Sequence, residues 1–164
     1  MAMYRDKSKK NFSVSSWQEA MEKALFLAHE GARAGEVPIG ALVLDEKGCL
    51  LSQAHNLVEK NHDASAHAEI LALRDASRLL KTPRLTGCTL IVTLEPCIMC
   101  AASISHFRLH RLVYGAYDPK GGGVDHGPRL FQMAGCLHRP KEIISGFRET
   151  DSAHLLKQFF KAKR

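Results

Sequence analysis

The sequence predicts a single α/β domain built around a five-stranded layered sheet. Segments with the 3.6-residue period of amphipathic helices alternate through the middle of the chain with short apolar segments typical of strands. The 164 residues are enough for one domain with a sizeable core. Hydrophobic residues make up 45% and charged residues 24%, which are ordinary values for a globular protein. We see no internal repeat or linker, so we expect one domain over residues 15–164 behind a basic tail of residues 1–14.

We expect two helices and a pair of strands in the first half of the chain. The run Ser16–Glu19 has the Ser-x-x-Glu form of a capping box, which predicts that a helix begins there, and Gly31 and Gly35 indicate its end. Strand-forming segments over residues 39–44 and 49–54 flank a turn. A second helix is expected behind His67, where apolar residues recur near the helical period.

The second half is expected to hold three strands and two helices. Pro96 occupies the predicted first position of a helix, where its missing N–H costs nothing. Asp151 can cap the last helix, and the run Gly121–Gly123 predicts a flexible loop. The predicted strands cover residues 88–93, 111–115 and 142–145.

The charge of the chain is concentrated at its ends. The formal net charge is +6, and the first ten residues alone contribute +3. After Asp151 the chain carries Lys157, Lys161, Lys163 and Arg164 without an acidic residue. Basic ends can contact a polyanion, although solvated charge is the commoner explanation.

Composition also predicts the compartment. No run approaches the ~18 apolar residues of a membrane-spanning helix, so we expect no membrane partner. No apolar segment follows the basic first ten residues, as a signal peptide would require. Five cysteines, an odd number, favour reduced thiols or metal binding over disulfides. We therefore expect a cytoplasmic protein.

Two short motifs indicate a zinc site. His67 and Glu69 stand at the start of one predicted helix, and Cys97 and Cys100 stand three apart at the start of another. A helix N-terminus favours thiolates over thiols. Imidazole and thiolate are zinc ligands, and three protein ligands with one open position form the catalytic arrangement. Glu69 beside a zinc-activated water can take its proton and pass it to a leaving group.

Each motif alone is weak evidence. Cys-x-x-Cys also occurs in redox proteins, and His-x-Glu is often a helix cap and a surface charge. Together, His-x-Glu followed by Pro-Cys-x-x-Cys is the signature of zinc-dependent nucleobase deaminases. A non-catalytic zinc module that only binds RNA is an alternative from another class. Glu69 argues against it, because a structural zinc site normally has a fourth protein ligand and needs no base.

Longer stretches of the chain carry a family resemblance. They are Val37-Pro38-Ile39-Gly40-Ala41, Asn56, Ala66-His67-Ala68-Glu69-Ile70 with Ala72-Leu73-Arg74, Thr93-Leu94-Glu95-Pro96-Cys97-Ile98-Met99-Cys100-Ala101, and Phe159-Phe160 followed by basic residues. In these stretches the chain resembles the bacterial tRNA-specific adenosine deaminases, which convert the wobble adenosine of the anticodon loop to inosine. The resemblance runs from about Trp17 to Arg164.

The resemblance implies a three-layer α/β/α fold of the cytidine-deaminase type, with a central five-stranded mixed sheet. It also implies a homodimer with one zinc ion (Zn²⁺) per subunit and contacts to the tRNA anticodon loop from both subunits. Carried over by position, His67, Cys97 and Cys100 are the zinc ligands and Glu69 is the catalytic proton shuttle. The implied reaction is the hydrolytic deamination of adenosine to inosine in tRNA.

The resemblance further implies a set of substrate-binding residues. Asn56 matches the family's pocket asparagine, and Pro38 and Leu94 match positions of the pocket wall. Without the resemblance, Asn56 would be explained as a turn residue and the other two as packing residues. Asp118 matches an aspartate in a loop that approaches the flanking nucleotides. The implied RNA contacts at the C-terminus are Phe160, Lys161, Lys163 and Arg164.

The chain departs from the family pattern outside the zinc motifs. Ala64 replaces a usual proline, Val124-Asp125-His126 stands where relatives have Gly and then Ser, and Leu137-His138-Arg139 replaces Asn-His-Arg. The second change bears on selectivity for the anticodon loop rather than on deamination. A deaminase of free bases or nucleosides, of the guanine or cytosine type, would have nearly the same catalytic centre and is the main alternative. The basic ends favour a nucleic acid substrate.

Overall fold

The computed structural model describes residues 13–164 and contains all five predicted strands within one residue of their expected bounds. The strands are β1 (Gly40–Leu44), β2 (Leu50–His55), β3 (Thr89–Leu94), β4 (Arg111–Ala116) and β5 (Glu142–Ile144). The helices are α1 (Trp17–Arg33), α2 (Val58–Asn61), α3 (Ala68–Leu80), α4 (Ile98–His106) and α5 (Glu149–Ala162), with a short 3-10 helix, η1, at Leu130–Gln132.

The strands form one mixed sheet, as expected, in the order β2-β1-β3-β4-β5. β1 is antiparallel to both β2 and β3, whereas β4 is parallel to β3 and to β5. The carboxyl ends of β3 and β4 therefore lie at the same edge of the sheet. In open α/β sheets, the carboxyl ends of parallel strands are where ligand sites form.

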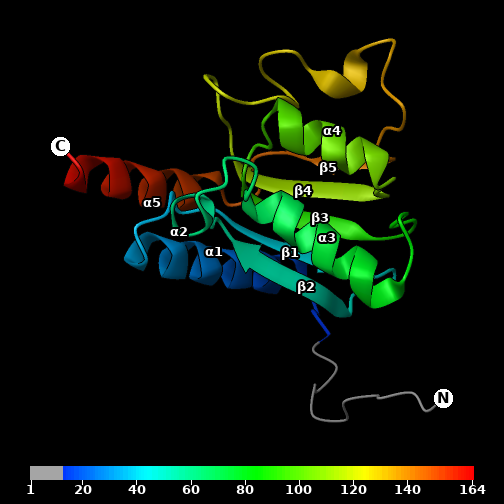
Figure 1. The fold of residues 1–164 in the computed structure, drawn as a ribbon, viewed down its shortest axis with the longest axis horizontal. Coiled ribbons are helices and arrows are strands. Elements are labelled where there is room, and N and C mark those ends of the chain that lie inside the picture. Colours follow the sequence, from blue (N-terminus) through cyan, green and yellow to red (C-terminus); the bar gives the residue numbers. More distant parts are fainter. Residues whose placement is uncertain (1–12) are drawn as a thin grey trace.

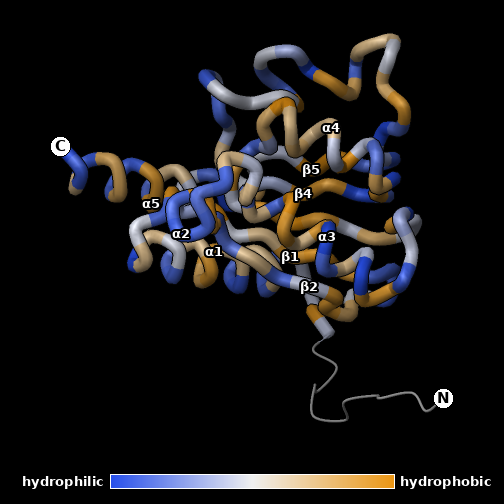
Figure 2. The backbone as a smooth tube through the Cα atoms, viewed as in Figure 1, coloured by the Kyte–Doolittle hydropathy of each residue, from blue (hydrophilic) through white to orange (hydrophobic). Residues whose placement is uncertain are grey.

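Helices cover both faces of the sheet, which confirms the three-layer architecture (Figure 1). α1 and α5 pack on one face, and α3 and α4 form the opposite layer. Along β3, Leu90 and Val92 belong to the core under α3 and α4, while Ile91 belongs to the core under α1. Both faces of the central strands are thus apolar, and Figure 2 shows hydrophobic residues gathered along them. Among the described residues, no helix is long and apolar enough to cross a membrane.

The starts of three helices test the capping predictions. Ser16 is the N-cap of α1, as expected, and its side chain accepts the N–H of Glu19 at 3.2 Å. Pro96 is not the first residue of α4, because Cys97 has extended backbone angles, pairs with the glycine loop as an isolated bridge and is the N-cap. Asp151 does not cap α5. Arg148 takes that position, and its Nε donates to the Asp151 carboxylate at 2.8 Å.

Two short helices and the N-terminal tail complete the description. α2 and η1 were not predicted, since three or four residues are too few to show a helical period. The predicted basic tail of residues 1–14 lies outside the described residues except for its last two. Ser13 and Val14 pair with the turn after β1, where the Val14 N–H donates to the Gly48 carbonyl at 3.0 Å.

The run Gly121–Gly123 is a closely packed segment, which differs from the expected flexible loop. Gly122 and Gly123 are buried. A Cβ atom on Gly122 would overlap the Glu95 carboxylate, and one on Gly123 would overlap the backbone of Ile98. These glycines allow the backbone to approach the start of α4, so their role is close packing rather than mobility.

The contact between α1 and β1 gives a prediction of stability. A Cβ atom on Gly40 would fall inside the Ala24 carbonyl oxygen, in the backbone of α1. We expect Gly40→Ala to lower the free energy of unfolding by about 1–3 kcal/mol, because helix and strand must separate to admit the methyl group. Urea unfolding would measure this change. Gly135→Ala is the matched control, since its Cβ would meet nothing within 4 Å and should change stability by less than about 0.5 kcal/mol. Equal midpoints for the two variants would contradict the prediction.

Candidate metal centre and substrate cavity

The ends of two helices define the candidate site. α3 and α4 belong to the same layer, and their N-termini meet beside the carboxyl end of β3. His67 is the N-cap of α3 and Cys97 is the N-cap of α4. Neither side chain makes a capping hydrogen bond to its own helix. Both side chains are therefore free to turn toward each other.

The structure brings together the three predicted metal ligands. The ligand atoms of His67, Cys97 and Cys100 all lie within 4.8 Å of one another. The His67 Nδ1 lies 3.7 Å from the Cys97 sulfur and 3.5 Å from the Cys100 sulfur. One imidazole nitrogen and two sulfurs converging on one point are a donor set that suits zinc, and their number leaves a fourth position open.

The electrostatics of the two cysteines also suit a metal ion. A hydrogen bond with Cys100, followed by one with His67, lowers the pKa of the Cys97 thiol to about 4. The hydrogen bond with Cys97 and burial raise the pKa of the Cys100 thiol. Without metal, the pair thus shares a proton between a Cys97 thiolate and a Cys100 thiol. The hydrogen bond to Cys97 raises the pKa of His67 as well. Metal binding would displace these protons, as it does at thiolate sites.

Glu69 is a buried carboxylate without a partner for one of its oxygens. Its side chain comes from the first turn of α3, and the residue is 2% exposed. Its Oε2 has no hydrogen-bond partner among the described residues. Burial raises the pKa of Glu69 to about 7. A carboxylate with this pKa beside a metal site can accept a proton and donate it again near neutral pH.

Asn56 holds the start of α3 in place of the missing cap. Its side-chain oxygen accepts the N–H of Ala68 at 2.8 Å, and its own N–H donates to the Ile39 carbonyl at 3.3 Å. The residue is 4% exposed and lines the cavity described next. Because the side-chain oxygen is engaged, the amide NH₂ group is the part of Asn56 that can meet a ligand.

A cavity of about 890 Å³ joins the metal ligands to the end of α5. It contains His67, Cys97 and Glu69. Six of the eight predicted substrate-binding residues line it: Asn56, Leu94, Asp118, Phe160, Lys163 and Arg164. The other two are not in the wall. Pro38 is buried in the chain before β1, and Lys161 is exposed on a different side of α5.

Several residues of the wall were not found from the sequence. Glu36 is 1% exposed and accepts the N–H groups of Glu59 and Lys60, so it holds α2 against the cavity. Tyr117 stands on the loop after β4, and Leu156 is on α5. None of these residues belongs to a metal-ligand spacing or a charge cluster. Only the tertiary fold shows that they meet.

Comparison with known proteins identifies relatives over most of the chain. Residues 14–116 match the cytidine and deoxycytidylate deaminase zinc-binding region. A tRNA-specific adenosine deaminase of Agrobacterium fabrum is 49% identical over 145 residues, which are 88% of this chain and 93% of that protein. The enzyme of the same name from Bacillus subtilis is 42% identical over 144 residues, covering 88% of each chain.

Solved structures show the same fold. One from a study of A-to-I editing by tRNA:A34 deaminases at the wobble position of transfer RNA has a TM-score of 0.80 and 46% identity, covering 83% of this chain and 97% of that one. A guanine deaminase from Nitrosomonas europaea has a TM-score of 0.78 at 22% identity, covering 92% of this chain and 88% of that one. The second likeness, at this identity, concerns the fold alone.

The raised pKa of Glu69 gives a prediction for the metal-free protein. The folded state holds the proton up to about pH 7, whereas an unfolded glutamate releases it near 4.5. Folding therefore becomes less favourable as pH rises from 5 to 7, by about 2 kcal/mol for this group. Glu69→Gln removes this dependence, so in the presence of a chelator and a reductant the variant should gain stability relative to wild type as pH rises.

Only the difference between the two proteins reports on Glu69. The lowered pKa of Cys97 makes the free energy of unfolding rise with pH, but this contribution is the same in wild type and in Glu69→Gln. Urea unfolding of both proteins at pH 5, 6 and 7 is the measurement. Unfolding free energies that stay parallel over this range would show that Glu69 does not hold a proton in the folded chain.

Proposed function

The chain belongs to the tRNA-specific adenosine deaminases of the cytidine and deoxycytidylate deaminase family, and we propose that it converts adenosine to inosine at the wobble position of tRNA. His67, Cys97 and Cys100 would hold one zinc ion per subunit. Glu69 would be the proton shuttle.

The observation that carries this proposal is the extent of the cavity. It runs from the metal ligands and Glu69 to Phe160, Lys163 and Arg164 on α5. A free base would occupy only part of it. An aromatic ring and two cations beyond the reacting group suit a flipped nucleotide with its neighbours, since bases stack on aromatic rings and phosphates attract cations.

The chemistry follows from the donor set and the unpaired carboxylate. Zinc, when bound, supplies a water whose pKa is lowered to about 7. Hydrolysis would form a bond between the oxygen of that water and the carbon that bears the amino group, and would break the bond from this carbon to nitrogen. The unpaired oxygen of Glu69 is available to accept one proton of the water and to donate it to the amino group, which would leave as ammonia. Asn56 orients the base with its free amide group, while its oxygen keeps α3 and His67 in position. Leu94 forms part of the apolar wall around the base.

We further propose a cytoplasmic homodimer. The relatives carry the names of tRNA-modifying enzymes, which act where tRNA is used. α4 and η1 contact each other, and this side of the molecule exposes three large apolar side chains: Ile98, Met133 and Leu137. Exposed apolar side chains grouped on one side are suited to a contact between subunits.

Incubation of the zinc-loaded protein with tRNA is the direct test of function. We expect inosine at the wobble position and release of ammonia. Free adenosine, cytidine, cytosine and guanine in parallel reactions test the alternative, because the guanine deaminases share this fold. Turnover of a free base without inosine in tRNA would replace the proposal by that alternative. RNA binding without ammonia release would indicate a non-catalytic module.

Substitutions at the centre should separate proton transfer from metal binding. We expect Glu69→Ala to retain zinc and to lose inosine formation by at least about 100-fold, since general acid–base catalysis contributes roughly 10²–10⁴-fold. Cys97→Ala should lose zinc and activity together. Zinc content by mass spectrometry and single-turnover rates measure both effects. A Glu69→Ala protein that retains zinc and wild-type turnover would exclude Glu69 as the shuttle.

The basic end of α5 gives a prediction for RNA binding. Replacing Lys161, Lys163 and Arg164 with glutamine should weaken tRNA binding. It should also reduce the slope of log K against log salt by up to roughly 2, because each phosphate contact on a single strand contributes about 0.7. The single-turnover rate at saturating tRNA should change little, since uniform binding affects KM rather than turnover.

The matched control removes the same charge from the opposite edge of the sheet. It replaces three exposed cations near the turn after β1 and the loop after α3: Lys47, Lys81 and Arg84. This control should keep the wild-type salt slope. Equal slopes for all three proteins would mean that the end of α5 makes no phosphate contact.

A further inference from the structure

One buried carboxylate organises the loop that follows β4. Glu95 is 1% exposed and comes directly after β3. Its Oε1 accepts the backbone N–H groups of Val124, Asp125 and His126 at 3.2, 2.9 and 2.9 Å. Its Oε2 accepts the N–H of Asp118 at 3.0 Å and lies 2.8 Å from the Nδ1 of His126. Burial would raise the pKa of Glu95, but these hydrogen bonds together lower it.

The His126 side chain completes this set. An ionised carboxylate can only accept, so the His126 Nδ1 carries the proton and donates it. The same ring packs at 77° against Tyr117, with their centroids 5.8 Å apart. Tyr117 in turn packs at 89° on Tyr114 of β4, at 5.6 Å. His126 thus links the carboxylate after β3 to the aromatic ring at the start of the loop.

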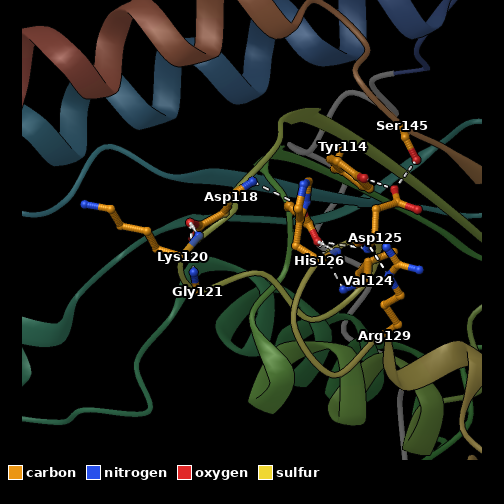
Figure 3. Close-up of polar contacts among 10 residues, drawn as sticks. Tyr114, Asp118, Lys120, Gly121, Val124, Asp125, His126, Arg129 and Ser145 are labelled. Carbon is orange, nitrogen blue, oxygen red and sulfur yellow. Dashed lines mark hydrogen bonds and ion pairs between the residues drawn. The ribbon is translucent and has the colours of Figure 1, made fainter.

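A second anchor ties the far side of the loop to the sheet. The Asp125 carboxylate accepts hydrogen bonds from the hydroxyl groups of Tyr114 and Ser145, the latter at 2.8 Å. Figure 3 shows Asp125 directed toward both residues, with His126 turned to the other side. The Nε of Arg129 donates to the Asp125 carbonyl at 3.0 Å. The Val124-Asp125-His126 segment therefore supplies two independent anchors.

The anchored loop forms one side of the substrate cavity. Tyr117, Asp118, Lys120 and Gly121 line it, while His126 does not. Asp118 also folds the loop tip, since its side chain accepts the N–H groups of Lys120 and Gly121 at 3.2 and 3.0 Å. An aromatic ring, a carboxylate and an ammonium group on one fixed segment can stack a base, contact a base edge and hold a phosphate. Their usefulness depends on the loop keeping its position.

We propose that His126 is a positioning residue, which holds Tyr117 and Asp118 at the cavity through its hydrogen bond to Glu95 and so sets the affinity for nucleotides flanking the target. This inference rests on the proposed function, because it assigns the loop to the RNA substrate. His126 lies outside the metal ligands and the cavity wall. Its loss should therefore weaken RNA capture and leave zinc binding and the chemical step intact.

Two substitutions separate the hydrogen bond from the ring. His126→Phe keeps an aromatic ring beside Tyr117 but removes the donor to Glu95. His126→Asn removes the ring but places an amide N–H near the position of Nδ1. We expect His126→Phe to raise KM and the Kd for an anticodon stem-loop about tenfold, as for one lost hydrogen bond to a charged group. His126→Asn should stay within about threefold of wild type.

The control and the readouts distinguish positioning from general damage. His29→Phe makes the same change on the exposed side of α1 and should leave KM, Kd and kcat unchanged. For every protein, zinc content, the midpoint of thermal unfolding and kcat at saturating RNA are measured beside KM. The expected signature of His126→Phe is a higher KM and Kd with kcat within twofold, normal zinc content and rescue in His126→Asn.

Other results would overturn the proposal. An unchanged KM and Kd in His126→Phe would mean that the hydrogen bond does not position the loop. Equal losses in both variants, accompanied by loss of zinc or of thermal stability, would indicate a purely structural role. Wild-type protein that binds the stem-loop without forming inosine would refute the proposed activity, and the Kd comparison would still decide the role of His126. Wild-type protein that neither binds nor deaminates RNA would refute both.

Discussion

The site depends on one constraint, which is that the first residues of α3 and α4 must meet at the same edge of the sheet. Both helices belong to one layer and follow strands of the central sheet. The proposed zinc ligands His67 and Cys97 occupy their N-cap positions and cap neither helix. Asn56 supplies the missing bond for α3 from the end of β2. Freed from capping, the two side chains can share a metal with Cys100, and the positive helix ends favour the thiolates.

Two equally buried glutamates differ in their hydrogen bonding and therefore in their pKa values. Glu69 and Glu95 are 2% and 1% exposed. Glu69 keeps an unpaired oxygen, and burial raises its pKa to about 7. Glu95 accepts five hydrogen bonds, which together hold its pKa below the ordinary value. The first carboxylate is available for proton transfer, whereas the second is committed to holding a loop.

The sequence was sufficient to predict the parts that follow from local patterns. Hydrophobic patterns predicted every strand and the three long helices, and the spacing of His67, Cys97 and Cys100 predicted the group of metal ligands. Pro96 and Asp151 were wrong as helix-start predictions. The pairing of Cys97 with Gly122, which is distant in the sequence, sets the backbone at the start of α4, and Arg148 is the N-cap of α5 and binds the Asp151 carboxylate. The Glu95 loop could not be predicted, because its bonds join residues about 30 positions apart. The prediction of a flexible loop at Gly121–Gly123 was wrong for a different reason: glycine occurs both in flexible loops and where two backbone segments pack closely, and the sequence does not distinguish these two uses.

The position of the last residues has a practical consequence for handling the protein. Figure 1 shows α5 projecting beyond the sheet, and Lys163 and Arg164 are part of the cavity wall. A purification tag or fusion partner attached after Arg164 would begin at the wall of this cavity. In the proposed function, an acidic linker placed there would compete with RNA phosphates for Lys163 and Arg164, and a cleavable linker would remove that competition.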